Sequence, residues 1–196
     1  MSLIYLGGIN GVGKTTIAQE TAKRFPTLRI LHGATELMKS LGVSVGDYDS
    51  LRKISEEVKG QAAEEIFRNL ATESQNADRM VVAHYVKILN GIITPNYGLW
   101  YGYCQRLVLV VSPPEEILDR INSDANSGRR VQRNLFGARH PTRQKRVKFL
   151  ERAQRVSNQV MRKAAEEFHI PSFRVENLNG EKTVAVNQLA CVIQGR

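Results

Sequence analysis

Apolar residues gather in five short runs along the chain, and longer stretches with helical periodicity separate these runs. The runs cover residues 3–8, 28–32, 80–84, 107–111 and 172–177. They are rich in Val, Ile and Leu and lack strict alternation, which is typical of strands that are buried on both faces. Regular alternation of such strands with helices predicts a three-layer α/β sandwich, in which a five-stranded parallel sheet carries helices on both faces.

Local residue types mark several helix ends. Asp47 or Asp49 is a suitable N-cap for a long polar helix that runs toward Gln75. Residues 112–115, Ser-Pro-Pro-Glu, predict a second helix start, with serine as the N-cap and proline at the first helical position. Pro171 ends a helix over about residues 141–169 and starts the last strand in an extended conformation. The apolar face of the final helix, after the Asn179-Gly180 turn, is expected in the core.

The decapeptide GGINGVGKTT at residues 7–16 follows the first apolar run and satisfies the pattern G-x-x-x-x-G-K-[ST]. Its glycines let the backbone aim successive N–H groups at phosphate oxygens, and the helix that follows adds its positive dipole end. Lys14 is placed to bridge the β- and γ-phosphates, and the Thr15 hydroxyl is placed to hold Mg²⁺. The sequence therefore predicts a P-loop that binds ATP or GTP. The expected contacts are Gly8, Asn10, Gly11, Val12, Gly13, Lys14, Thr15 and Thr16.

Composition fits an ordinary globular protein. With 196 residues and 42% apolar residues, the chain is expected to form one domain over residues 1–196. No run approaches 18 apolar residues, and the first strand leaves no room for a signal peptide, so we expect neither a membrane span nor secretion. Cys104 and Cys191 match no metal-ligand spacing, so we expect two buried thiols in a reducing cytoplasm.

Positive charge is concentrated in one part of the sequence. The formal net charge is +9, and residues 119–163 hold 13 Lys and Arg against three acidic residues, whereas the remainder is close to neutral. A charge that served only solubility would be spread along the chain. The concentrated block indicates contact with polyanions, either the phosphates of nucleotides or those of nucleic acid.

The residues after the predicted strands favour phosphoryl transfer over a molecular switch. Switch GTPases and motor ATPases usually place an acid after an apolar strand to help hold Mg²⁺, but these strands lead into His32, His84 and Ser112. Four arginines surround the polar loop 122–128, where they are expected to fold over bound phosphates, neutralise them and exclude water. They are Arg120, Arg129, Arg130 and Arg133.

Several segments, taken in order, resemble the adenylate kinases of archaeal type, within the nucleoside monophosphate kinase group of P-loop proteins. The likeness runs over nearly the whole chain. It rests on GGINGVGKTT, HGATELMK, LRKI, VVAHYVKILNGIITPNYGLW, DRINSD, LERAQ and VENLNG. Val82 stands where members of that family often carry an acid, two positions before His84.

The resemblance implies a role for particular side chains. Gly33 and Thr35 would form the acceptor pocket within an acceptor-binding part at about residues 32–75, and Arg52 would grip the acceptor phosphate. His84 would contact the acceptor or a water molecule, and Asn177 would lie beside the donor base. Four arginines would stabilise the transferring phosphoryl group, two of them from a small arginine-rich lid at about residues 121–145. They are Arg120, Arg129, Arg130 and Arg152.

Three functions remain open at this stage. The first is transfer from ATP to a nucleoside monophosphate, with AMP giving two ADP in the presence of Mg²⁺, as the resemblance implies. The second is an RNA- or ribosome-associated ATPase that contacts RNA through residues 119–163. The third is a kinase of another small acceptor. The missing acid at the end of the third strand keeps this function open, since a hydroxyl acceptor would usually want a general base.

Overall fold

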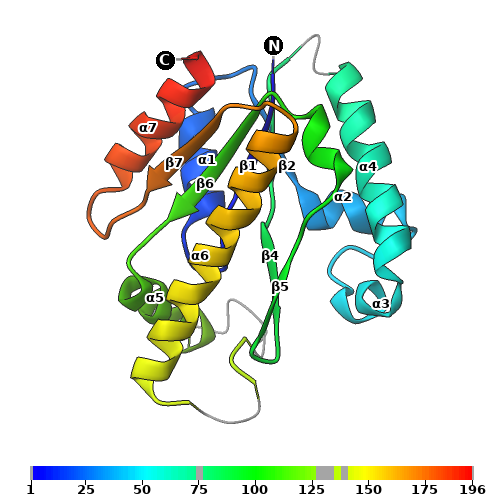
Figure 1. Cartoon of the computed structure of the whole chain (residues 1–196). Helices are drawn as coiled ribbons and strands as arrows, with labels where there is room; N and C mark the ends of the chain where they lie inside the picture. The colour runs from blue at the N-terminus through cyan, green and yellow to red at the C-terminus, as the bar shows by residue number, and fades with distance from the viewer. Residues whose placement is uncertain (1, 74–76, 127–134, 138–140, 196) are drawn as a thin grey trace.

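The structure is a computed structural model that describes residues 2–73, 77–126, 135–137 and 141–195. Its centre is a five-stranded sheet in the order β2-β3-β1-β6-β7, and every neighbouring pair is parallel. Figure 1 shows this sheet with helices on either side. The predicted three-layer α/β sandwich is therefore confirmed. The sheet strands are β1 (Leu3–Gly7), β2 (Arg29–His32), β3 (Arg79–Val82), β6 (Arg106–Val111) and β7 (Ser172–Glu176).

Seven α-helices and one 3₁₀ helix lie in the part of the chain that the structure describes. They are α1 (Lys14–Ala22), α2 (Gly33–Ser40), α3 (Tyr48–Lys53), α4 (Glu56–Glu73), α5 (Pro114–Asn126), α6 (Arg143–Glu167), α7 (Lys182–Gln194) and η1 (Leu99–Tyr103). None of these helices is long and apolar enough to cross a membrane.

Side chains alternate between two cores because successive residues of a strand point to opposite faces. In β1, Ile4 and Leu6 enter one core with residues of α1, α5 and α7. Leu3 and Tyr5 enter the other core with residues of α4, α6 and η1. Both faces of the three central strands are buried, which explains why their sequences show apolar runs without alternation. The expectation of burial on both faces is wrong for β2 and β7, which lie at the sheet edges and keep exposed residues.

The structure contains a β-hairpin that the sequence analysis did not predict. It consists of β4 (Val86–Leu89) and β5 (Ile92–Pro95), which pair antiparallel next to the main sheet (Figure 1). Asn90 and Gly91 form its tip with φ of 50° and 77°, the positive values that a two-residue hairpin turn requires. Asn-Gly between apolar residues was the available signal.

The long polar helix predicted from residue 47 to Gln75 is two helices. Asp47 caps α3 as expected, because its side chain accepts a hydrogen bond from the Ser50 N–H at 3.0 Å. Ile54 is extended, with ψ of 139°, and the Ser55 hydroxyl accepts from the Val58 N–H to start α4. A second N-cap inside the polar stretch therefore divides it.

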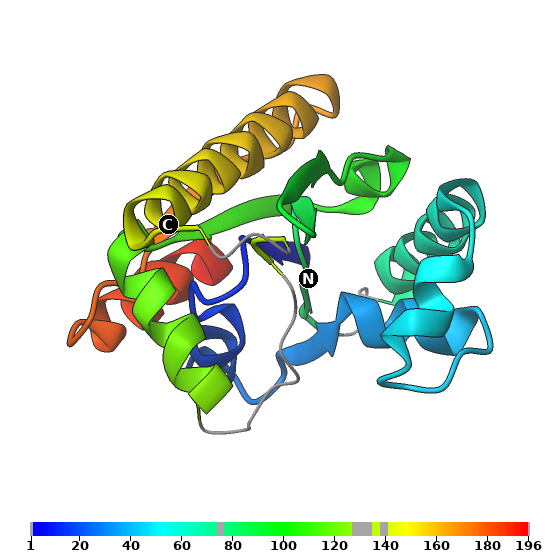
Figure 2. The same cartoon turned by 90° about the horizontal axis from the view of Figure 1, so that it is seen from below.

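All five sheet strands deliver their next residues to one edge. The P-loop follows β1, Gly33 follows β2, His84 lies two residues beyond β3, and Ser112 and Asn177 follow β6 and β7. The carboxyl edge of a parallel sheet is where such folds bind ligands. Figure 2 shows that edge, with α2, α3 and α4 on one side of the P-loop and α5 and α7 on the other.

Candidate functional site

The P-loop backbone has a shape that only glycine permits at two points. Gly8 has φ of 152°, and a Cβ there would lie 2.6 Å from the Val110 carbonyl oxygen. Gly13 has φ of 87°, and its Cβ would collide with the Asn177 side chain. The left-handed conformation and the close approach together exclude other residues, so the loop is pressed against the ends of β6 and β7.

Lys14 lies in the first turn of α1 with its side chain folded over the loop. Its Nζ donates to the carbonyl oxygens of Gly8 and Ile9 at 3.0 and 2.9 Å, and the residue is only 8% exposed. These carbonyl contacts hold an ammonium group at the centre of the loop, the position expected of the lysine in a phosphate-binding P-loop. Thr15 is half-buried beside it in the same turn, and Thr16 is exposed.

His84 joins the end of β3 to the P-loop. Its Nδ1 lies 2.8 Å from the Gly8 carbonyl oxygen and 3.5 Å from Lys14 Nζ. Its backbone carbonyl accepts hydrogen bonds from Tyr5 Oη at 2.9 Å and from Asn96 Nδ2 at 2.8 Å. Two donors thus fix the backbone of His84, and the imidazole lies on the β3 side of the loop.

A cluster of buried tyrosines supports this side of the site. The ring of Tyr5 lies 4.9 Å from the rings of both Tyr85 and Tyr101, and all three side chains are fully buried. Burial raises the pKa of each hydroxyl, so each is a protonated donor at neutral pH. Sequence reasoning missed the cluster because its members come from three separated segments.

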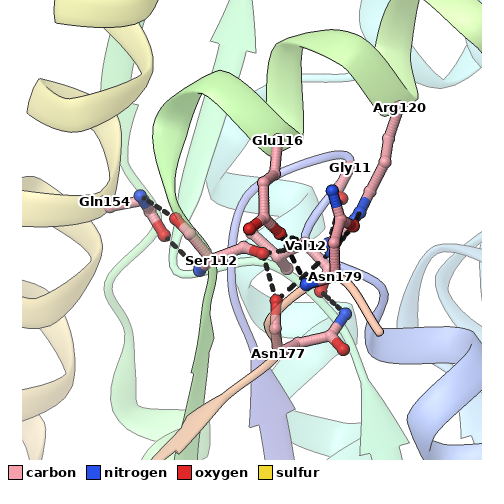
Figure 3. A network of polar contacts seen from close by, with 8 residues as sticks. All are labelled: Gly11, Val12, Ser112, Glu116, Arg120, Gln154, Asn177 and Asn179. Carbon is pink, nitrogen blue, oxygen red and sulfur yellow. Dashed lines mark hydrogen bonds and ion pairs between the residues drawn. The ribbon is translucent and has the colours of Figure 1, made fainter. Parts of the chain in front are cut away.

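Arg120 is the centre of a polar network on the opposite side of the P-loop (Figure 3). Its guanidinium donates to the Gly11 carbonyl at 3.4 Å, to Ser112 Oγ at 2.9 Å and to Asn179 Oδ1 at 2.7 Å. It also reaches the Asn177 carbonyl at 3.3 Å. The resemblance implies contact with the transferring phosphoryl group, whereas this guanidinium links the ends of β6 and β7 to the loop.

Glu116 and Gln154 complete the network that Figure 3 shows. Glu116 pairs with Arg120 at 3.0 Å and accepts from the Asn179 N–H at 2.9 Å. Gln154 brackets the backbone of Ser112, accepting from its N–H at 3.1 Å and donating to its carbonyl at 2.9 Å. Sequence reasoning missed these residues, although a Glu four positions before an Arg on a helix was a readable signal.

Ser112 does not cap a helix as the sequence predicted. Helix α5 begins at Pro114, and the Ser112 hydroxyl donates to the Asn177 carbonyl while it accepts from Arg120. The hydroxyl is therefore used to join two strand ends. A local pattern at residues 112–115 gives no information about a partner that lies 65 residues away.

A cavity of about 230 Å³ opens beside this network. Asn177 forms part of its wall and also donates from Nδ2 to the Val12 carbonyl at 2.8 Å, which ties the loop to β7. The cavity is therefore continuous with the P-loop on its β7 side. It is lined by Gly13, Thr16, Ile17, Arg120, Asn177, Leu178, Asn179, Gly180 and Lys182.

The residues expected at the acceptor lie toward β2 and β3. Gly33 starts α2, and a Cβ there would lie 3.0 Å from Ala83, next to His84. Thr35 is half-buried in the first turn of α2. Arg52 is exposed on α3 and pairs with Asp49, and within the described residues no contact joins it to the P-loop.

The other predicted arginines are not brought to the P-loop by described contacts. Arg152 is exposed on α6. Arg129, Arg130 and Arg133 lie outside the described residues, as does part of the predicted lid. Helices α5 and α6, which flank residues 127–140 in the sequence, are joined by an ion pair. Arg143 donates to both carboxylate oxygens of Asp119 at 2.8 and 3.2 Å. This hydrogen bonding holds the pKa of the Asp119 carboxyl below its usual value.

The donor set that the described residues offer to a metal ion is small. They contain no group of three or more His, Cys, Asp or Glu side chains that could hold a metal ion together. Of the two cysteines that were expected to be buried, Cys104 is buried and Cys191 is exposed. Mg²⁺ in phosphoryl-transfer sites keeps several waters and binds through one or two protein oxygens plus substrate phosphates. The Thr15 hydroxyl, beside Lys14, fits that limited requirement, and Val82 at the end of β3 adds no carboxylate.

Replacing Arg120 tests whether the network shapes the cavity. We expect Arg120→Ala to lower the free energy of unfolding by about 1–3 kcal/mol, because Glu116 and the Asn177 carbonyl lose their donor. We expect Arg120→Lys to restore little of this free energy of unfolding, since a single ammonium group does not reproduce the planar array of donors on the guanidinium group. Urea unfolding and calorimetric titration with ATP measure both effects. A Lys variant equal to the wild type in stability and affinity would contradict this role.

Comparison with solved structures finds kinases of the same fold. A shikimate kinase from Acinetobacter baumannii in complex with shikimate covers 100% of this chain and 94% of its own, with TM-score 0.60 and 15% identity. A shikimate kinase from Bacteroides thetaiotaomicron covers 98% of both chains, with TM-score 0.62 and 12% identity. A sugar kinase from Janibacter sp. gives TM-score 0.55 at 12% identity over 99% and 95% of the two chains.

The fold and the loop thus define the class: a P-loop α/β protein with the fold found in small-molecule kinases. No protein-family model matches the sequence, and no curated protein matches it. At identities of 12–15% the structural likeness extends to the fold alone. The acceptor must therefore be argued from the site.

Proposed function

We propose that the protein is an ATP-dependent kinase that transfers the γ-phosphoryl group to a nucleoside monophosphate, with AMP as acceptor and two ADP as products. One observation carries the proposal: the Lys14 ammonium lies over the glycine loop, between a cavity on the β7 side and the His84–Gly33 side of the sheet edge. Such an arrangement suits a donor nucleotide stretched across the loop.

Sheet order gives the donor a direction. The strands run β2-β3-β1-β6-β7, so the cavity at the end of β7 lies on one side of β1 and its loop, while β3 and β2 lie on the other. A base held in the cavity, beside Arg120 and Asn177, directs the triphosphate across the loop. The γ-phosphate then points toward His84 and Gly33, where the acceptor is expected.

Phosphoryl transfer on this site needs positioning and positive charge more than covalent chemistry. An oxygen of the AMP phosphate forms a bond to the γ-phosphorus, and the bond from that phosphorus to the β–γ bridging oxygen breaks to release ADP. Lys14 and the P-loop N–H groups hold the β- and γ-phosphates during this exchange. Bound Mg²⁺, with Thr15 as its protein ligand, would neutralise charge on the same phosphates.

A second candidate acceptor is a small hydroxylated molecule. The structural neighbours include shikimate kinases and a sugar kinase. AMP is preferred for two reasons. The resemblance to archaeal-type adenylate kinases continues from the P-loop through HGATELMK and LRKI, and the exposed Arg52 on α3 would supply a cation for a phosphate-bearing acceptor.

A coupled assay for ADP formation distinguishes the acceptors. It would present Mg·ATP with AMP, CMP, GMP, UMP, dTMP or shikimate, and we expect the highest kcat/KM with AMP. Transfer to shikimate but to none of the nucleotides would refute AMP as the acceptor and would leave the kinase activity supported. Failure with every acceptor, in a protein that still binds Mg·ATP, would refute the proposed function.

Arg52 offers a sharper test of the acceptor side. We expect Arg52→Ala to raise the KM for AMP by about 10–100-fold with little change in kcat, because a charge-assisted bond to the acceptor phosphate contributes about 1.5–3 kcal/mol. Lys53→Ala is the matched control, as it removes the neighbouring exposed charge of the same helix. Equal KM values for Arg52→Ala and wild type would remove Arg52 from the site.

A further inference from the structure

The outward side of α6 carries a row of basic side chains that the proposed kinase reaction does not explain. Five exposed residues recur at spacings of three, four, three and seven, which places them on one face of the helix. We call this row the α6 stripe. It consists of Lys145, Lys148, Arg152, Arg155 and Arg162.

The stripe faces away from the sheet. Residues on the other side of α6, such as Leu150, Ala153 and Ala164, are buried against the cores. In both views of the fold, α6 lies at the outside, with no other described helix or strand against its outward side (Figures 1 and 2). The stripe is therefore open to a partner while the sheet edge with the P-loop is open to nucleotides.

Most of the stripe's charge is uncompensated. Within the part of the chain that the structure describes, only Arg155 makes an ion pair, with Glu151 at 3.6 Å between two exposed side chains. Several exposed basic residues elsewhere are paired at closer range, for example Lys23 with Glu20 and Lys39 with Glu36, both at 3.0 Å. A straight row of cations with one weak ion pair produces a positive field along its length.

We propose that the α6 stripe binds the phosphodiester backbone of a nucleic acid, with RNA as the first candidate. From Lys145 to Arg162 the helix advances about 25 Å at 1.5 Å per residue, which matches several consecutive phosphates along a strand. The proposal rests on α6 and is independent of the acceptor of the kinase reaction.

A membrane surface fits the stripe less well. Helices that lie on membranes insert large apolar side chains beside their cations. The described large apolar side chains that are exposed lie on other segments, and none belongs to α6. Cations without apolar neighbours favour a ligand that is held by charge alone.

The experiment measures binding of a labelled 20-base-pair RNA duplex, and of a DNA duplex of the same sequence, by fluorescence anisotropy from 50 to 200 mM salt. Five phosphate contacts predict a slope of log K against log salt of about −4. We expect K145Q/K148Q/R155Q/R162Q to bind at least about tenfold more weakly at 50 mM salt, with a slope near −1 from the remaining Arg152. Glutamine keeps helix propensity close to that of lysine and arginine.

The matched control is K23Q/K39Q/R68Q/R174Q. It removes the same four charges, but from exposed residues that are already paired with acids. We expect its affinity to stay within twofold of the wild type. Far-UV circular dichroism and thermal midpoints show that both variants fold, and the ADP assay follows the kinase site separately.

Four results would overturn the proposal. Equal losses in the stripe variant and the control would show that net charge alone drives binding. Wild-type affinity in the stripe variant would locate the contact elsewhere. Displacement of RNA by saturating Mg·ATP would show that RNA binds in the nucleotide site. Binding to phosphatidylserine vesicles without binding to either duplex would show that the partner of the α6 stripe is a membrane surface.

Discussion

Lys14→Met should lower the rate of phosphoryl transfer by about three orders of magnitude or more, the range that removal of a transition-state cation produces in phosphoryl transfer. The substitution keeps an unbranched side chain of similar length in a nearly buried position, and it removes the ammonium that lies over the Gly8 and Ile9 carbonyl oxygens. The charge that develops on the β- and γ-phosphates then loses its nearest protein cation.

Single-turnover measurements with saturating Mg·ATP and AMP test this expectation, because they separate chemistry from binding and product release. His84 still meets the Gly8 carbonyl in this variant, so the loop keeps one of its side-chain contacts and the thermal midpoint should change little. Lys59→Met, on α4, is the control for loss of a partly buried lysine outside the P-loop. Transfer within tenfold of the wild type in Lys14→Met would exclude Lys14 from the reaction.

Gly7→Ala should lower the free energy of unfolding strongly, although the substitution adds only one methyl group. Gly7 ends β1 just before the P-loop, and a Cβ there would collide with the ring of Tyr85, a fully buried side chain. Tyr85 has little room to move, since the Tyr5 ring lies 4.9 Å away and its own hydroxyl donates to the Val108 carbonyl. Overpacking of a filled core costs about 1–3 kcal/mol, and a rigid ring beside backbone favours the upper end.

A double-mutant cycle attributes this cost to one contact. In a Tyr85→Val background the Cδ2, Cε2 and Cζ atoms that the methyl group would meet are gone, so Gly7→Ala should cost less than about 1 kcal/mol. Urea unfolding of the four proteins supplies the cycle. An unchanged penalty in the Val background would mean that the strand itself, and not Tyr85, rejects the methyl group. Gly42→Ala is an unsuitable comparison because its φ is 67°, whereas Gly60→Ala, in open space on α4, should be tolerated.

Features of the fold could be predicted from the sequence when residues close together in the chain determine them. The P-loop shape follows from glycines and Lys14 within ten residues, and buried strands need apolar side chains on both faces. The Asn90-Gly91 hairpin also has a local cause, but short strands with exposed residues such as Leu89 and Ile92 gave a weak periodic signal. The polar stretch is divided into α3 and α4 because Ser55 caps the start of α4, and a uniform pattern of polar residues does not reveal such a cap.

Contacts between distant segments were beyond sequence reasoning. Arg120 meets Asn177 and Asn179, which lie 57 and 59 residues further along the chain, because parallel strands bring the ends of β6 and β7 to one edge. The same geometry gives Ser112 a bonding partner in place of a capping role. For α6, composition revealed an excess of cations, and only burial showed that five of them share the outward face.

The amino-acid sequence alone determined that this protein has a glycine-rich loop with the P-loop pattern between a buried strand and a helix, and that the central parallel strands beside it are apolar on both faces. These properties follow from short-range spacing and from the need to remove apolar side chains from water. Only the tertiary structure decided which polar side chains meet around Arg120, which tyrosines pack beneath His84 and which cations on α6 face solvent. Such contacts depend on how segments that are far apart in the chain pack against one another, and the spacing of residues along the sequence does not reveal which segments meet.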